Sequence, residues 1–141
     1  MTELEEIQEL YRNYLAEAEE VVRTKKFMDG IWGCGKHPAD HPCHGKLLED
    51  LEVALCTFEK TDPPSGQIRE VLSYIYNAPQ EKGGIPSVYW LLIAAHKLTL
   101  PLIGRLDPAD ACALAEQYGA DYPRRTRLPA QDQVFAALSR R

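Results

Sequence analysis

VYWLLIAA, residues 88–95, is the stretch of this sequence that decides the fold. It follows Pro86 and Ser87, which suit the opening of a helix, and it has almost no polar face before His96 and Lys97. A helix that is apolar nearly all round lies in the middle of a domain, and a run this short cannot span a bilayer. We therefore expect a central helix here, which Pro101 ends or kinks.

Three amphipathic segments before this stretch predict helices that cover it. The first runs over residues 3–28, where Thr2 and Glu5 have the spacing of a capping box. The second begins at residue 44 or 45 and ends before Asp62, with apolar residues at helical spacing. The third continues from the prolines at 63 and 64, which suit a first turn, until Pro79.

Two further helices are predicted after it. Asp107 as N-cap, Pro108 at the first helical position and Asp110 in the first turn open one helix, and Gly119 is expected to lie just past its end. Pro129 opens a short last helix. Because no run of alternating β-branched residues is long enough for a sheet, we predict one all-α domain over residues 1–141. It has about six helices in a compact bundle or irregular array, with a long N-terminal helix and a Cys/His-rich loop between the first two helices.

The charge of the chain argues against nucleic acid or an anionic membrane as the main partner, because its formal net charge is −5. The charge is unevenly distributed, since residues 1–20 hold seven glutamates and residues 122–141 hold five arginines. The arginines in YPRRTRLP could bind an acidic partner, pair with glutamates of the first helix, or simply face water. The candidate partner-binding residues are Arg124, Arg125 and Arg127.

The N-terminus, MTELEEIQEL, has neither a basic nor an apolar region of the kind that a secretory signal contains. We therefore expect a cytoplasmic protein whose four cysteines are reduced thiols, available to metal or to chemistry rather than to disulfides.

The segment GIWGCGKHPADHPCHG, residues 30–45, gathers most of the residues that could carry chemistry. Zinc takes thiolate and imidazole ligands together, four in a structural site or three with a water in a catalytic one. Five ligands in eleven residues cannot all bind one ion comfortably, so a subset of three or four is expected, with a remote fourth from His96, Cys56 or Cys112. The candidate ligands in the segment are Cys34, His37, His41, Cys43 and His44.

Two other interpretations of this segment stay open. It can be a metal-free Gly/Pro-rich loop whose histidines cap helices or bind backbone carbonyls. It can also carry thiol chemistry, because Cys43 lies near the start of a helix, where the dipole favours a thiolate, and His44 or His41 could act as its base. His96 is either a satisfied core histidine or a catalytic or metal-binding group that reaches the segment from the central helix.

These observations favour an interaction or structural domain with a zinc-stapled Cys/His loop over an enzyme, because no paired catalytic constellation is recognisable. The alternative is a metal- or thiol-dependent enzyme or sensor that uses the same loop, with Cys43, His44 and His96 as candidate catalytic residues. Since the first helix has an apolar stripe that approaches a heptad, both a monomer and a homodimer are compatible with the sequence.

Overall fold

The computed structural model of this chain describes residues 2–24, 42–81, 93 and 95–140. All regular structure in these ranges is helical, which confirms the predicted all-α class. The six α-helices are α1 (Glu3–Thr24), α3 (Pro42–Lys60), α4 (Ser65–Glu81), α6 (Leu100–Ile103), α7 (Pro108–Asp121) and α8 (Pro129–Ser139). Two 3₁₀ turns, η2 (Lys97–Thr99) and η3 (Arg124–Thr126), accompany them.

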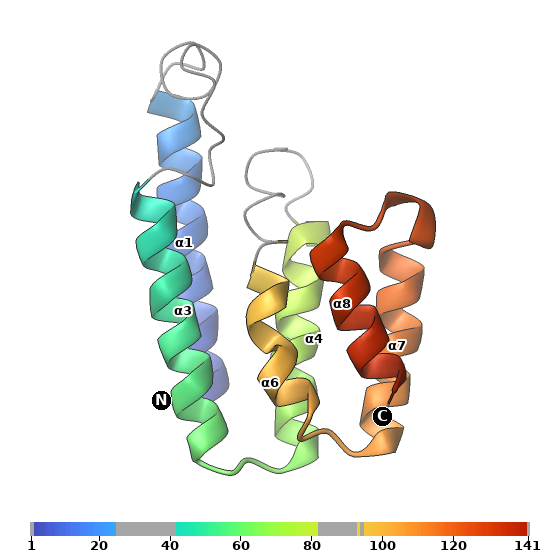
Figure 1. The fold of residues 1–141 in the computed structure, drawn as a ribbon. Coiled ribbons are helices and arrows are strands. Elements are labelled where there is room, and N and C mark those ends of the chain that lie inside the picture. The colour runs from blue at the N-terminus through green and yellow to red at the C-terminus, as the bar shows by residue number, and fades with distance from the viewer. Residues whose placement is uncertain (1, 25–41, 82–92, 94, 141) are drawn as a thin grey trace.

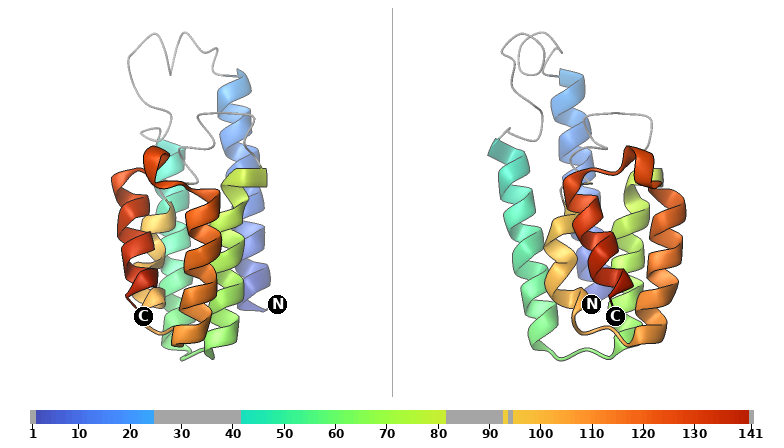
Figure 2. Two further views of the ribbon diagram at one scale, coloured as in Figure 1. Left: turned by 90° about the vertical axis from the view of Figure 1, so that its right-hand side faces the viewer. Right: turned by 45° about the vertical axis from the view of Figure 1, so that its right-hand side comes forward.

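The helices stand side by side in three groups (Figure 1). α1 and α3 pack on each other as one flank, α4 and α6 occupy the middle, and α7 and α8 pack on each other as the opposite flank. Figure 2 shows the same order from the α7–α8 side, with α7 and α8 in front of the other helices. Most of the apolar stretch for which we predict the central position, residues 88–92 and 94, lies outside the described residues.

The N-terminus of α1 has the predicted capping box. The backbone N–H of Glu5 donates to Thr2 Oγ1 at 3.2 Å, and the backbone N–H of Thr2 donates to Glu5 Oε2 at 3.4 Å. Ile7 and Tyr11 are buried on the apolar stripe of α1. Residues 25–28, the end of the predicted first helix, lie outside the described residues.

α3 begins earlier than the sequence suggested, at Pro42 rather than at residue 44 or 45. A proline fits the first helical position because its missing N–H would have no helical partner there. Cys43 and His44 therefore belong to the first turn of α3 and not to the predicted loop. The rest of that loop, residues 30–41, lies outside the described residues.

α4 differs from its prediction at both ends. Pro63 and Pro64 lie just before Ser65, the first residue of α4, and the Pro64 carbonyl accepts the N–H of Ile68 at 3.2 Å. Pro79, which we expected to end the helix, lies inside it, because α4 continues to Glu81. The predicted apolar face is confirmed, since Ile68, Val71, Leu72 and Ile75 are all buried.

Pro101 does not end the helical path of the central segment, because it lies in the first turn of α6. The helical residues before it tighten into η2, and α6 then continues past Pro101 to Ile103. A proline within a helix removes the bond to the carbonyl four residues earlier, here that of Lys97, and this accounts for the change of helix type at η2.

The start of α7 is as predicted, but its end is not. Asp107 is the N-cap residue and Pro108 opens the helix, although the Asp107 side chain makes no capping bond. Gly119, expected just past the end, lies within α7, which ends at Asp121. A Cβ at position 119 would lie 3.1 Å from Cε1 of Phe135 on α8, so the glycine provides space for this ring.

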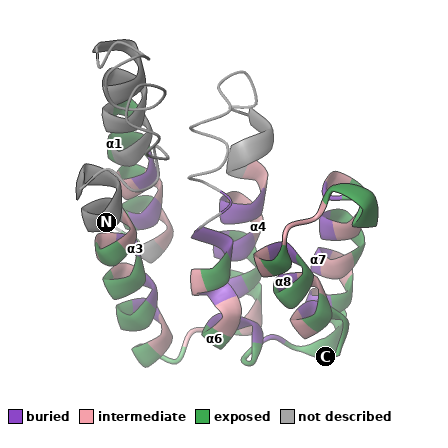
Figure 3. Cartoon of the chain, turned by 45° about the horizontal axis from the view of Figure 1, so that its top comes forward, coloured by how far each residue is buried: buried purple, intermediate pink, exposed green. Residues whose placement is uncertain are grey.

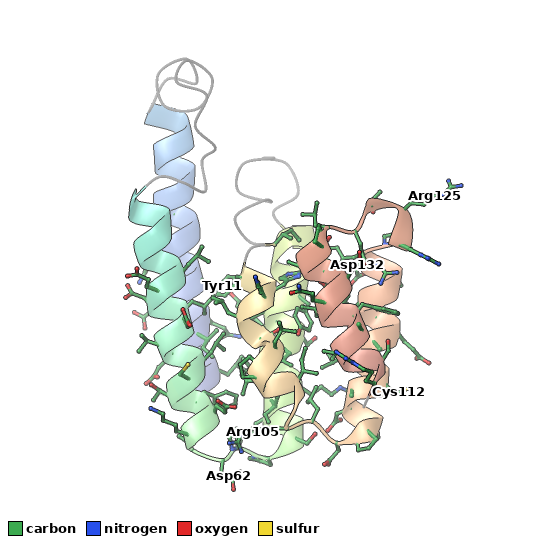
Figure 4. The ribbon with its side chains drawn as sticks, in the orientation of Figure 1. Tyr11, Asp62, Arg105, Cys112, Arg125 and Asp132 are labelled. Atoms are coloured by element: carbon green, nitrogen blue, oxygen red, sulfur yellow. The ribbon has the colours of Figure 1, made fainter. Side chains whose placement is uncertain are left out.

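Side chains that face one another across the helices form the core (Figure 3). At the end of the bundle where α3 meets α4, Arg105 lies 3.3 Å from Glu59 and 3.1 Å from Asp62 (Figure 4). Ser65 joins the first turns of α4 and α7, because its hydroxyl donates to Asp110 and accepts the N–H of Asp107 at 2.8 Å. None of the described helices is long and apolar enough to cross a membrane.

Candidate functional site

His96 is the one predicted catalytic candidate whose side chain the structure describes, and it lies sealed in the core. Its side chain is 0% exposed, just before η2. Three tyrosine rings surround it, with ring centroids at 5.1 Å for Tyr76, 5.6 Å for Tyr118 and 5.4 Å for Tyr122. We call His96, Thr99 and these three tyrosines the His–Tyr cluster.

Hydrogen bonds in the His–Tyr cluster have a defined direction. The Thr99 hydroxyl donates to the backbone carbonyl of His96 at 2.7 Å. Since that hydroxyl has a single hydrogen, the Tyr76 hydroxyl, 2.7 Å away, must donate to Thr99 Oγ1. The Tyr122 hydroxyl donates to the backbone carbonyl of Tyr76, and the Tyr118 hydroxyl lies 2.9 Å from His96 Nδ1. The cluster therefore ties α4, η2 and α7 together.

The imidazole of His96 is held in its neutral form. Burial lowers its pKa to about 3, and the backbone of Ile75 opposes part of this shift. Pro79, four residues after Ile75, has no N–H and cannot make the usual helical bond to the Ile75 carbonyl. His96 Nε2 has no well-formed hydrogen bond of its own, so the Ile75 backbone gives it only weak compensation.

Solvent does not reach this imidazole in the described part of the chain. Burial raises the pKa of the Tyr76 phenol, and its bond to Thr99 lowers it by less. The crevice between α4 and α7 beside Tyr76 and Tyr118 has no room for a water molecule. A general base needs access to a substrate proton, so the described geometry makes His96 a packed, hydrogen-bonded core residue.

The proposed zinc ligands are only partly within the described residues. Cys43 and His44 lie in the first turn of α3, whereas Cys34, His37 and His41 lie outside the described ranges. Among the residues that the structure does describe, no three or more His, Cys, Asp or Glu side chains are close enough to hold a metal ion.

The three remote ligands suggested for the Cys/His segment are far from one another. His96 belongs to the His–Tyr cluster, and Cys56 and Cys112 are exposed free thiols on α3 and α7, on opposite flanks. Cys56 also lies thirteen residues after Cys43 on one helix, a rise of about 20 Å, so these two cysteines cannot bind the same ion.

The arginines 124, 125 and 127 form the turn between α7 and α8, which we call the arginine turn. Arg124 and Arg125 are exposed, and Arg125 points away from the bundle (Figure 4). Arg127 behaves differently, because its guanidinium lies 4.2 Å from the centroid of the Phe135 ring and its Nε lies 3.7 Å from Asp132. Its side chain is only 9% exposed, and its Nε has no hydrogen-bond partner.

Among the described residues, none of the three arginines forms an ion pair with α1 of the same chain. α1 lies on the flank opposite to α7 and α8 (Figure 1). Arg127 instead pairs with Asp132 of α8, and Arg124 and Arg125 form no ion pair with any residue that the structure describes.

A surface groove between α7 and α8 is a feature that sequence reasoning missed. Its volume is about 460 Å³, within the size range of small-molecule sites. We call it the α7–α8 groove, and its lining includes Pro108, Cys112, Ala115, Glu116, Phe135 and Leu138. One sequence pattern could have indicated the groove. Small residues lie on one face of α7, where α8 approaches, at Cys112, Ala115 and Gly119.

Comparisons with protein families, with curated protein sequences and with solved structures find no match to this chain.

Proposed function

We propose that this protein is an interaction domain that binds an acidic, amphipathic segment of a partner in the α7–α8 groove. The groove itself carries the proposal, because it combines apolar side chains with an open surface, and because Phe135 in its lining contacts Arg127 of the arginine turn. The half-buried side chains of Phe135 and Ala115 would contact apolar side chains of the partner. Arg124 and Arg125, which have no ion pair among the described residues, would meet its carboxylates.

The chemistry of the buried groups supports binding rather than catalysis. The histidine with a strongly shifted pKa, His96, is enclosed by tyrosines and has no path to solvent in the described region. The exposed polar residues in the lining of the groove are Glu116 and Ser139, and a polar border of this kind is typical of an interface rim.

A fluorescently labelled helical peptide tests this proposal directly. The peptide carries leucines on one face and glutamates on the other, and its binding is followed by fluorescence anisotropy. Cys112→Lys places a long side chain in the groove and should weaken binding about tenfold or more. Gln133→Lys adds the same charge at an exposed position of α8 outside the groove and should bind as the unmodified protein does. Equal affinities for the two variants would overturn the proposal.

The Cys/His segment belongs to this proposal as a zinc-stapled element that fixes the start of α3. A subset of Cys34, His37, His41, Cys43 and His44 would bind one zinc ion with thiolate and imidazole ligands. A reducing compartment such as the cytoplasm would keep these thiols available. Cys43 lies in the first turn of α3, so its thiolate would join the site to this helix start. Neighbouring residues of a helix do not face each other, so the subset would include Cys43 without His44.

Elemental analysis of protein purified without chelator measures this zinc. We expect about one equivalent, lost in Cys43→Ala and retained in Cys56→Ala, because Cys56 lies far along the same helix. Protein that contains no zinc, and whose melting temperature does not change with a chelator, would refute the zinc site.

A thiol-dependent enzyme or sensor is the second candidate function, and the position of Cys43 favours it. In the first turn of α3, Cys43 lies at the positive end of the helix dipole, which stabilises a thiolate. Iodoacetamide at neutral pH should then modify Cys43 faster than the exposed thiols Cys56 and Cys112, as followed by mass spectrometry. Equal rates at the three cysteines would remove this candidate.

A further inference from the structure

The outward face of α3 carries an exposed apolar side chain. Val53 is 65% exposed and is the large hydrophobic residue that stands out on the described surface. Glu49 and Glu52 lie beside it within one helical turn, and both are exposed. An apolar side chain among carboxylates is the chemistry that we assigned to a ligand of the α7–α8 groove.

The two flanks of the bundle differ in charge. α1 and α3 together hold eleven acidic and four basic residues, so their flank is strongly negative. Residues 122–140, on the opposite flank, hold four arginines and a single acidic residue. The α1–α3 flank is therefore acidic and carries the exposed Val53, whereas the α7–α8 groove and the arginine turn belong to the other flank. Figures 1 and 2 show these two flanks on opposite sides of the bundle.

We infer that the protein associates with itself head to tail, with the Val53 face of one copy in the α7–α8 groove of the next. Val53 would contact Phe135 and Ala115, which line the groove and are half-buried, while Glu49 and Glu52 would face the arginine turn. This inference rests on the proposed function, because it names a second copy of the chain as the partner that fills the groove.

Charge decides against the symmetric alternatives. If two α3 faces met, Glu49 and Glu52 of one copy would repel the same glutamates of the other copy. If two arginine turns met, Arg124 and Arg125 of the two copies would repel each other in the same way. Because the two complementary faces lie on opposite flanks, the contact cannot close on itself in a pair of copies. It extends into a short chain or closes into a ring of more than two copies.

Sedimentation velocity over a wide range of protein concentration tests the inference. We expect oligomers that grow with concentration at low salt. They should dissociate in about 1 M salt, where the Debye length is about 3 Å. Val53→Asp should weaken association about tenfold or more, because it places a charge at the centre of the contact. Gln67→Asp, which adds the same charge at an exposed position of α4, should associate as the unmodified protein does.

A charge-exchange experiment tests which faces meet. The double variants Arg124→Glu/Arg125→Glu and Glu49→Lys/Glu52→Lys should each be monomeric, because each opposes like charges across the contact. Their mixture should associate again, since the reversed α3 face of one fits the reversed turn of the other. Two variants that associate separately, or a mixture that stays monomeric, would overturn the pairing of faces.

The results distinguish failure of the self-association inference from failure of the proposed interaction function. If the unmodified protein is monomeric at every concentration but binds the acidic peptide through the groove, self-association is wrong and the interaction domain stands. If the protein neither associates nor binds the peptide, both are wrong.

Discussion

Acidification should destabilise this protein through His96 well above the pH at which carboxylates titrate. The pKa of His96 is about 3 in the folded protein, against 6.5 for an ordinary histidine. Between these values the unfolded chain binds a proton that the folded chain does not. The stabilising contribution is therefore fully present above the unfolded pKa and is lost as the pH falls towards the folded pKa. Linkage gives a loss of about 2 kcal/mol between about pH 7 and pH 5.

Urea denaturation at a series of pH values, followed by circular dichroism, measures this loss. His96→Asn is the matched variant, because it keeps an acceptor near the position of Nδ1 and removes the titrating ring. Its absolute stability will be lower, since a smaller side chain leaves space beside the Tyr118 ring. The quantity to compare is the change of the free energy of unfolding with pH. The carboxylates and the other histidines contribute equally to this change in both proteins, so the difference between the two proteins reports His96. We expect the unmodified protein to lose about 2 kcal/mol more than the variant from about pH 7 to pH 5.

Equal slopes in the two proteins would refute this reasoning. So would a His96 ring whose NMR resonances titrate near pH 6.5 in the folded state, because burial would then not be holding the ring neutral.

Two further predictions concern packing and the His–Tyr cluster. Gly119→Val should lower the free energy of unfolding by about 1 to 3 kcal/mol, because its side chain meets the Phe135 ring. Gly66→Ala, at a helical site with nothing within 4 Å, should raise it or leave it unchanged in the same thermal melts. Thr99→Val should cost about 1 to 3 kcal/mol, since it leaves the Tyr76 hydroxyl buried without its acceptor. Adding Tyr76→Phe to Thr99→Val should recover part of that loss, and a double variant less stable than Thr99→Val would contradict the assigned hydrogen-bond direction.

Local sequence signals located most of the described helices because those signals act within one turn. The Thr2–Glu5 capping box and the Asp107–Pro108 start need no tertiary information. The stripe from Ile68 to Ile75 is likewise a property of helical spacing alone, and all of its predicted apolar positions are buried.

The errors occur where tertiary contacts outweigh local preference. Gly119 costs a helix about 1 kcal/mol, but packing of the Phe135 ring against it favours the helix continuing. Pro79 has no N–H, so the Ile75 carbonyl loses its usual helical hydrogen bond. That carbonyl instead lies near His96, which belongs to another part of the chain.

The candidate sites were less predictable than the helices for the same reason. The partners of His96 lie 20 residues before it and 22 and 26 residues after it, at Tyr76, Tyr118 and Tyr122, and no periodic pattern links them. The α7–α8 groove depends on the distance between two helices, which the composition of α7 and α8 does not specify.

The exchange rates of the hydroxyl hydrogens in the His–Tyr cluster would measure how often the bundle opens. Those of Tyr76 and Thr99 are both engaged and buried, so they can exchange with water only when α4 and η2 separate. Hydroxyl hydrogens at an exposed surface exchange too quickly to be observed, whereas enclosed ones persist as resolved NMR resonances. Their lifetimes would therefore report how often the middle of the bundle opens, under native conditions and without any denaturant.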